Sequence, residues 1–401
     1  MKIRSITFFT HPGKVHDHRL EVLTKKLEPL TDAFTRAGWE IQSRRMATVP
    51  FGLYTNADSV VEEIQALEEK ANRLGFNYLS IGPARLQQQR EYACIADILA
   101  ATQNVFTSGM MAHHHRGISM EAVKACAEII TRAAPLTPDG FTNLRFCAMS
   151  HVAPFTPFFP AAYGYGPQPA FSIAVECADV AVDAFTSAKT VSQGKKDLLR
   201  TLNRAADEMQ GIIHHANLHW EMPFKGFDFS LAPFPEDWCS LAGAIEQLGV
   251  PAFGLMGSLS AAAILAETLD RGDWRHVGFN GLMLPVLEDS ILAKRSTESS
   301  FSIKDLLMIS AVCGTGLDTV PLPGDTDADS ITALLMDVAA LSLRLCKPLT
   351  ARLMPVPRLK AGEMTDYDFE FFENGKILDF PAAELGKAIS RSRWMEIKSR
   401  Y

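Results

Sequence analysis

The chain has 401 residues, of which 47% are hydrophobic and 21% charged, which excludes a largely disordered protein and suits a sizeable packed core. Its formal net charge of -7 provides no basic field for nucleic acid or an anionic membrane surface, so a small-molecule ligand is the expected partner. No apolar stretch is long enough to span a bilayer, and the seven cysteines lack metal-type spacing. We therefore expect a soluble, cytoplasmic protein, either monomeric or a homo-oligomer.

The first third of the chain alternates short apolar runs with helical patterns, which is typical of parallel strands joined by crossover helices. The expected strands cover residues 2–9, 39–46, 76–81, 104–108 and 145–150. The expected helices cover residues 20–34, 60–74, 172–187, 195–213, 258–269 and 330–346. A hairpin over 369–380 is expected to turn at Asn374 and Gly375. Because no linker, repeat or low-complexity tract interrupts the pattern, we expect one domain over residues 1–401.

Polar residues follow several of the expected strands. Sites in parallel α/β sheets form beyond the carboxyl ends of the strands, so these residues are candidates for a shared site. His11 follows the first strand, the segment 82–85 follows the third, the cluster 113–116 follows the fourth, and His151 follows the strand at 145–150. The alternative is that they belong to solvent-exposed loops, which are polar in any case.

The segment Cys313–Asp325 combines a thiol, glycines at 314, 316 and 324, two prolines and two carboxylates. Glycine permits backbone shapes closed to other residues and proline stiffens the chain, so the segment is able to hold Cys313 and Asp318 in a fixed arrangement. One interpretation is a catalytic loop. The alternative is a buried structural cysteine beside a tight turn.

Two further patterns suggest site residues. Glu288 and Asp289 are adjacent carboxylates after an apolar run, and each is a candidate base or metal ligand. Negative charge at a helix N-terminus explains the same pair equally well. Arg145 and Arg352 lie inside apolar, strand-like runs, where an inward arginine needs an anion. That anion is either a substrate group or an internal salt-bridge partner.

Several stretches together resemble the family catalogued as domain of unknown function 711. The matching stretches are 140–146, 157–163, 229–233, 277–290, 313–325, 349–357 and 361–362. The resemblance implies a pyruvate formate-lyase-like α/β barrel enclosing a central loop, with Cys313 in the barrel interior. It does not imply radical chemistry, because the glycyl-radical motif is absent and the late glycine, Gly386, lies in a different sequence.

Our leading hypothesis is an enzyme that acts on a small polar or carboxylate-bearing metabolite by non-radical acid/base or cysteine chemistry in the barrel interior. One alternative is a divalent-metal hydrolase that uses clustered carboxylates, Asp325 among them; another is a non-catalytic metabolite-binding protein. No cofactor is assigned beyond that divalent metal. The residues assigned to catalysis are Cys313, Asp318, Glu288 and Asp289. The residues assigned to substrate binding are Arg145, His151, Tyr163, Asp228, Ser230 and Arg352.

Overall fold

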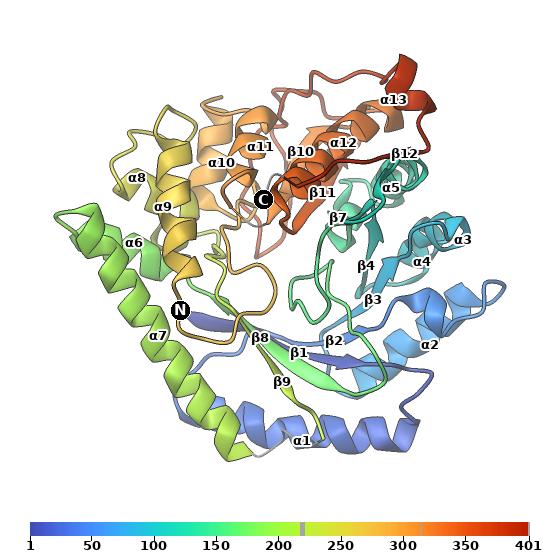
Figure 1. Ribbon diagram of the computed structural model, residues 1–401, viewed down its shortest axis with the longest axis horizontal. Helices are drawn as coiled ribbons and strands as arrows, with labels where there is room; N and C mark the ends of the chain where they lie inside the picture. The colour runs from blue at the N-terminus through green and yellow to red at the C-terminus, as the bar shows by residue number, and fades with distance from the viewer. Residues whose placement is uncertain (217–220, 314, 400–401) are drawn as a thin grey trace.

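The main sheet has nine strands, which run in the order β10-β11-β7-β4-β3-β2-β1-β8-β9 (Figure 1). The computed structural model describes residues 1–216, 221–313 and 315–399, so Gly314 of the cysteine segment lies outside the described residues. The strands of the main sheet are β1 (Lys2–Thr10), β2 (Arg44–Thr48), β3 (Tyr78–Ala84), β4 (Val105–Met110), β7 (Phe146–Ser150), β8 (Ala170–Glu176), β9 (Phe224–Asp228), β10 (Gly316–Pro323) and β11 (Leu349–Val356). A small sheet contains β5 (Ala112–His113), β6 (Gly117–Ser119) and β12 (Trp394–Met395).

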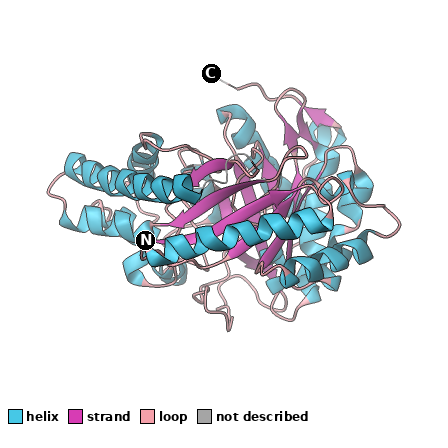
Figure 2. Cartoon of the chain, turned by 90° about the horizontal axis from the view of Figure 1, so that it is seen from below, coloured by secondary structure: helices cyan, strands magenta, loops and turns pink. Residues whose placement is uncertain are grey.

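Helices lie along the outer side of the curved sheet (Figures 1 and 2). In the first half they are α1 (Asp17–Arg36), α2 (Val60–Arg73), α3 (Gln89–Ala93), α4 (Ile95–Ala101), α5 (Met120–Ala133), α6 (Ala178–Ser187) and α7 (Val191–Ala216). In the second half they are α8 (Leu241–Gln247), α9 (Ser258–Asp270), α10 (Ser290–Thr297), α11 (Ile303–Ser310), α12 (Ala328–Leu345) and α13 (Lys387–Arg391). Short 3-10 helices occupy Phe51–Leu53, Ala134–Leu136, Phe141–Arg145 and Asp237–Cys239. None of the described helices is long and apolar enough to cross a membrane.

The strands run in two directions. Strands β1 to β4 and β7 are parallel to their neighbours within that block, as the alternating sequence pattern predicts. Strand β8 is antiparallel to β1, and β11 is antiparallel to β7, so both outer strand pairs run the other way. The α/β class is therefore confirmed. The ladder pairing leaves β9 and β10 at the two ends of the sheet.

Isolated bridges connect these two end strands to the chain between them. Phe227 bridges to His276 and Leu231 to Leu282, which places this segment beside β9 and the residues that follow it. Pro285 bridges to Asp318 of β10, and the Val286 backbone N–H donates to the Asp318 carbonyl over 3.1 Å. The segment 276–286 thus contacts both sides of the opening between β9 and β10.

The inner face of β1, β2, β3 and β8 is covered by the segment 151–169. The Ser80 hydroxyl donates to the Ala162 carbonyl over 2.7 Å, and the Ser172 hydroxyl donates to the Phe155 carbonyl over 2.9 Å. The Phe155 ring packs on the Phe9 ring at 5.4 Å between centroids. Short hydroxyl side chains on these strands therefore donate hydrogen bonds to backbone carbonyls of a segment that is not itself paired as a β-strand.

Two expected elements differ from the structure. Residues 170–176 form strand β8, whereas a helix is expected from residue 172. Their pattern has period two: Phe171, Ile173 and Val175 belong to the large outer core, while the hydroxyl of Ser172 faces the inner segment. The hairpin expected over 369–380 is also not formed, because the Asn374 side-chain oxygen accepts hydrogen bonds from the Thr365 hydroxyl and the Tyr367 backbone and holds an irregular turn.

Candidate functional site

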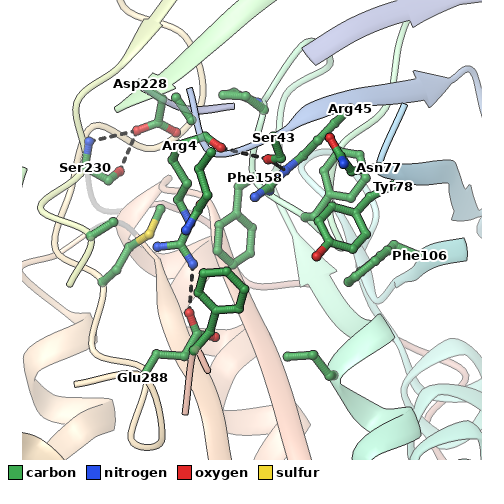
Figure 3. Close-up of a pocket in the computed structure, with 18 of the residues that line it drawn as sticks. Arg4, Ser43, Arg45, Asn77, Tyr78, Phe106, Phe158, Asp228, Ser230 and Glu288 are labelled. Atoms are coloured by element: carbon green, nitrogen blue, oxygen red, sulfur yellow. Dashed lines mark hydrogen bonds and ion pairs between the residues drawn. The ribbon is translucent and has the colours of Figure 1, made fainter. Parts of the chain in front are cut away.

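A cavity of about 270 Å³ lies at the amino ends of four neighbouring strands. Arg4 on β1, Arg45 on β2, Tyr78 on β3 and Phe106 on β4 all line it. Each stands within the first three residues of its strand, and the four strands are adjacent in the sheet. These side chains surround the centre of the view in Figure 3. One edge of the sheet thus gathers two arginines and two aromatic rings.

The cavity is at the opposite end of these strands from the one that the strand-end rule predicts. The antiparallel strands account for this, because the carboxyl ends of β8 and β9 arrive at the same edge and contribute Ala174, Val175 and Asp228. His11 and His151 follow the carboxyl ends of β1 and β7 and do not line the cavity. The rule therefore holds for β8 and β9, which the sequence pattern does not identify as strands.

A buried charge network forms one wall of the cavity. The Arg352 Nη2 group donates to Glu288 Oε1 over 2.9 Å, and its Nε group donates to Asp318 Oδ1 over 2.5 Å. The Arg4 Nη2 group donates to the second Glu288 oxygen, Oε2, over 2.8 Å. Glu288 therefore joins two arginines from opposite ends of the chain, and Arg352 joins two carboxylates.

The network moves the pKa values of its two carboxyl groups in opposite directions. Burial alone would raise the pKa of Glu288, but the attraction of Arg352 and Arg4 outweighs it and lowers this pKa. Burial raises the pKa of Asp318, and the negative charge of Glu288 adds to the rise, while Arg352 offsets only part of it. Glu288 is therefore the carboxyl group that is held ionised, and it is also the one that lines the cavity.

A bulge in β1 gives Arg4 its position. Ile3 pairs with Val175 and Ser5 pairs with Ala174, so Arg4 is the extra residue between two consecutive pairs. A bulge breaks the strict alternation of a strand and changes the direction of a side chain. Here it allows an arginine on a strand with a mostly buried side-chain pattern to reach Glu288.

Arg45 is the cation of the cavity that lacks a carboxylate partner among the described residues. Its Nε group donates to the Ser43 hydroxyl over 2.9 Å, and its guanidinium lies over the rings of Tyr78 and Phe159, at 5.6 and 5.2 Å from their centroids. Burial lowers the pKa of Arg45, and the positive charge of Arg4 lowers it further. Carboxylates instead raise the pKa of Arg4 and of Arg352 against the effect of burial.

Comparison with other proteins identifies the family. A family model described as "Uncharacterised ACR (DUF711)" matches residues 1–372. This chain belongs to the DUF711 family. The family resemblance inferred from the sequence is thereby confirmed.

Related proteins share most of the chain. A UPF0210 protein of Pyrobaculum aerophilum is 30% identical over 375 residues, which cover 86% of this chain and 81% of the relative. A UPF0210 protein of Clostridium botulinum is 28% identical over 370 residues, covering 86% of this chain and 82% of the relative. A solved structure titled "Anaerobic ribonucleotide reductase" matches with a TM-score of 0.37 and 9% identity, over 88% of this chain and 70% of that chain.

Five of the residues assigned from the sequence meet in or behind the cavity of this DUF711 protein. Glu288, Arg352, Asp228 and Ser230 line it, and Asp318 lies behind Arg352. Asp228 accepts hydrogen bonds from the backbone N–H groups of Ser230, Phe279 and Asn280 and from the Ser230 hydroxyl. Its carboxylate therefore fixes the segment after Gly278 against the end of β9, so its role at the cavity is to shape the wall.

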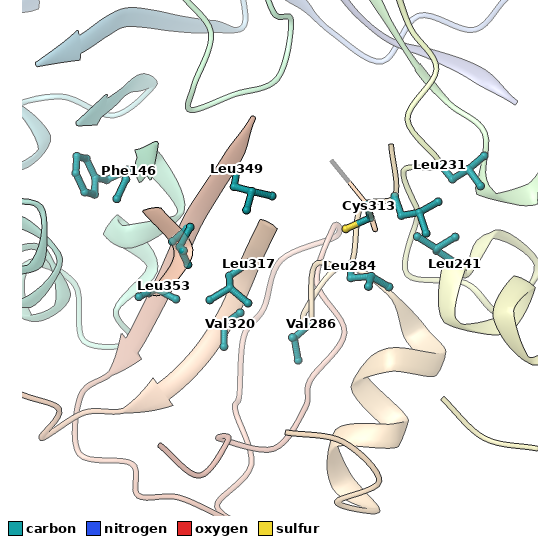
Figure 4. Close-up of a cluster of buried hydrophobic side chains, with 14 of the residues drawn as sticks. Phe146, Leu231, Leu241, Leu284, Val286, Cys313, Leu317, Val320, Leu349 and Leu353 are labelled. Atoms are coloured by element: carbon teal, nitrogen blue, oxygen red, sulfur yellow. The ribbon is translucent and has the colours of Figure 1, made fainter. Parts of the chain in front are cut away.

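Cys313 lies apart from the cavity lining. Its side chain is 2% exposed and belongs to the large hydrophobic core, together with Leu231, Leu241 and Leu284 (Figure 4). The Lys347 ammonium donates to the Ala311 carbonyl over 3.1 Å, and its lowered pKa reflects burial, partly offset by the interaction with Cys313. The assignment of Cys313 to catalysis stays a prediction without a cavity to support it.

Asp289 and Tyr163 have structural hydrogen-bond partners. Asp289 caps α10 through the Leu292 backbone N–H and also accepts from the Ser240 hydroxyl and two N–H groups at the start of α8. The Tyr163 hydroxyl donates to the Val152 carbonyl, inside a cluster that includes the cavity residues Phe158 and Met283. His151 lies with its ring centroid 6.1 Å from that of His114, away from the cavity lining.

Arg145 binds backbone carbonyls instead of an anion. Its guanidinium donates to the carbonyl oxygens of Leu99 and Thr102 over 2.6 and 2.9 Å, and thereby fixes the end of α4 against the start of β4.

Replacing Arg145 by Met should lower the free energy of unfolding by about 1–3 kcal/mol, because buried carbonyls lose their donors. Urea unfolding measures this loss. Weaker ligand binding at unchanged stability would contradict it.

The sequence analysis did not assign Arg4, Arg45 or Tyr78 to the site. The signal that identified Arg352, a charged residue inside an apolar strand-like run, was also present at Arg4, whereas Arg45 follows the polar residues 42–44 and gives no such signal. Tyr78 gives no such signal, because a strand commonly contains a tyrosine. Among the described residues, no group of three or more His, Cys, Asp or Glu side chains is arranged to hold a metal ion.

Proposed function

We propose that this DUF711 protein binds a small carboxylate-bearing metabolite in the cavity, with Arg45 as the residue that binds the carboxylate. The observation behind this proposal is the contrast among the three arginines of the cavity. Arg4 and Arg352 each pair with a carboxylate of the protein, whereas the partners of Arg45 within the described part of the chain are the Ser43 hydroxyl and two aromatic rings. Guanidinium groups keep their charge and bind carboxylates through two parallel N–H donors, so a carboxylate ligand would complete the pairing.

We further propose that the protein is an enzyme in which Glu288 accepts a proton from the bound metabolite. Its lowered pKa keeps the group ionised at neutral pH and also makes it a weak base, so the metabolite must supply an acidic proton. Glu288 lines the same cavity as Arg45. Arg4 and Arg352 each donate to one of its oxygens and fix its orientation, which is a requirement for proton transfer. Asp318 acts through Arg352 as a positioning residue. This scheme uses acid/base chemistry and needs no thiol.

The two alternatives that the sequence left open, cysteine chemistry and metal-dependent hydrolysis, find less support in the geometry. Cysteine chemistry requires access to Cys313, which is buried in the hydrophobic core. Metal-dependent hydrolysis requires the carboxylates at 288, 289, 318 and 325 to converge. Glu288 and Asp318 instead pair with arginines, Asp289 caps a helix, and Asp325 is exposed to solvent.

The site proposal includes the closed barrel that was expected from the sequence. We propose that the segment 276–286 completes the curved sheet between β9 and β10, supported by its bridges to both sides. Three site residues belong to this junction: Asp228 ends β9, Glu288 follows the segment, and Asp318 lies on β10. The site would then be built where the two ends of the sheet approach each other.

The test of the binding proposal is a comparison of Arg45→Met with Arg44→Met. Arg44 is the next residue on β2, and its guanidinium lies 5.6 Å from the Phe76 ring and outside the cavity lining. With acetate, lactate and benzoate as probes, isothermal titration calorimetry should show binding by the parent and the Arg44→Met variant. Arg45→Met should weaken it about tenfold or more, because a charge-assisted hydrogen-bond pair is lost. Equal affinities in both variants would overturn the proposal.

A further inference from the structure

Aromatic rings surround the proposed carboxylate anchor. Tyr78 and Phe106 make an edge-to-face pair at 5.4 Å, and Phe106 and Phe159 make another at the same distance. Phe158 adds a ring that lies 5.7 Å from the Arg352 guanidinium. Phe369 and Phe371 line the cavity from the segment near the C-terminus. A ligand held by Arg45 therefore meets ring faces or ring edges over much of its body.

The polar groups of the cavity are concentrated at its two sides. Figure 3 shows the Phe158 ring between the Arg4–Glu288 pair on one side and Arg45 with Tyr78 on the other. On the Arg45 side, the Asn77 side-chain oxygen accepts from the Arg44 backbone N–H over 2.8 Å. This bond fixes the orientation of the amide, so its nitrogen is the part left to serve as a second donor to an anion.

The balance of charge limits how many anionic groups the ligand carries. Arg4 and Arg352 are already paired with Glu288 and Asp318, so among the described cavity residues Arg45 is the one arginine without a carboxylate partner. A phosphate monoester or a dicarboxylate would bring a second charge next to Glu288, or against the aromatic walls, where it would lose water without gaining a partner. A single carboxylate matches the cavity.

From these observations we infer that the ligand is an aromatic monocarboxylate, with its carboxylate on Arg45 and its ring against Phe158. The inference rests on the proposed function and specifies its substrate class. Flat rings stack offset or edge-to-face against phenylalanine and tyrosine, which adds to the burial of apolar surface. A saturated ring of similar size fills the same volume without this geometry.

Four probes test the inference on the full chain by isothermal titration calorimetry: benzoate, cyclohexanecarboxylate, acetate and benzamide. We expect benzoate to bind about tenfold or more tightly than acetate and about threefold more tightly than cyclohexanecarboxylate, because only its ring both fills the cavity and stacks. Benzamide, which lacks the charge, should bind at least about tenfold more weakly than benzoate. Equal affinities for benzoate and cyclohexanecarboxylate would overturn the inference alone. Absence of binding by all three carboxylates would overturn the proposed function as well.

Two variants test whether the aromatic ring of the ligand contacts Phe158. Phe158→Leu should reduce the preference for benzoate over cyclohexanecarboxylate to about one, because leucine keeps the apolar surface and removes the stacking face. Phe155→Leu is the matched control: it lies in the same segment, packs on Phe9 and does not line the cavity, so the preference should stay unchanged. Thermal melts of both variants confirm folding before titration. A preference that survives Phe158→Leu, or that falls equally in both variants, would contradict contact with Phe158.

Discussion

Replacing Arg352 by Met is expected to lower the free energy of unfolding by about 3–5 kcal/mol, which is the cost of removing one partner from a buried ion pair. The variant leaves Asp318 without its ion-pair partner and leaves Glu288 with Arg4 alone. Both carboxyl groups are largely buried, with side chains 3% and 7% exposed, so water does not replace the lost guanidinium. Urea unfolding of the parent and the variant at pH 7 measures the difference.

The pH dependence of this loss has a definite sign. In the parent, the lowered pKa of Glu288 contributes stability that is present above the unfolded pKa and is lost as pH falls through the folded pKa. Without Arg352, the pKa of Asp318 rises further, and the pKa of Glu288 rises relative to the parent because only Arg4 opposes burial. The folded variant therefore takes up protons more readily than the parent as pH falls. The destabilisation should therefore be smaller at pH 5 than at pH 7.

A triple variant provides the control for the charge argument. Arg352→Met combined with Glu288→Gln and Asp318→Asn removes both buried carboxylates together with Arg352, and it leaves the partly exposed Arg4 with the attraction of Glu176. It should therefore recover part of the stability that the single variant loses. A triple variant less stable than Arg352→Met, or a single variant that loses less than about 1 kcal/mol, would show that the network does not stabilise the fold as described.

The sequence predicted those parts of the fold whose signals are local. The apolar stripe of Leu20, Leu27 and Phe34 identified α1, and all three side chains are buried as predicted. Residues 172–176 were included in an expected helix because a short apolar run fits either element, and only the pairing with β1 shows that they form a strand. Strand order was also beyond reach, because β11 pairs with β7, although β8, β9 and β10 lie between these two strands in the chain.

The sequence identified several residues of the candidate cavity but indicated a different edge of the sheet from the one at which the cavity lies. Glu288, Asp318 and Arg352 were chosen from residue type and context, and the structure brings them together. Arg4 contacts Glu288 across a sequence separation of 284 residues, which no local pattern encodes. The polar strand ends suggested the opposite edge of the sheet because β8 was not identified as a strand. Cys313 was chosen partly because glycines follow it in the sequence. The structure gives Gly316 a structural reason instead: its φ is +98°, and a Cβ atom at this position would collide with the Thr350 backbone.

Substitution of Asp289 is expected to cause the second large loss of stability. This variant distinguishes a structural role of Asp289 from the catalytic role assigned from the sequence. Its Oδ2 atom accepts from the N–H groups of Leu241 and Ala242 over 2.7 and 3.1 Å, and its Oδ1 atom accepts from the Ser240 hydroxyl and the Leu292 N–H over 2.5 and 3.0 Å. One carboxylate thus serves the first turns of two helices, α8 and α10. Replacing Asp289 by Ala should lower the free energy of unfolding by about 3 kcal/mol, from two lost caps and the buried donors left without acceptors.

Asp289→Asn should lose roughly half as much, about 1–2 kcal/mol, because its amide group presents a donor to one of the two pairs whichever way it is oriented. Asp327→Ala is the matched control, since that exposed aspartate caps α12 through one backbone bond of 2.6 Å, to Ser330, and its loss should cost about 1 kcal/mol. Urea unfolding ranks the three variants, and benzoate titration reports the cavity. If Asp289→Ala kept the parent's stability and lost ligand binding or turnover, the carboxylate would be a site residue after all; the geometry predicts the reverse, because every oxygen of Asp289 already serves the backbone and hydroxyl groups that hold α8 and α10 together.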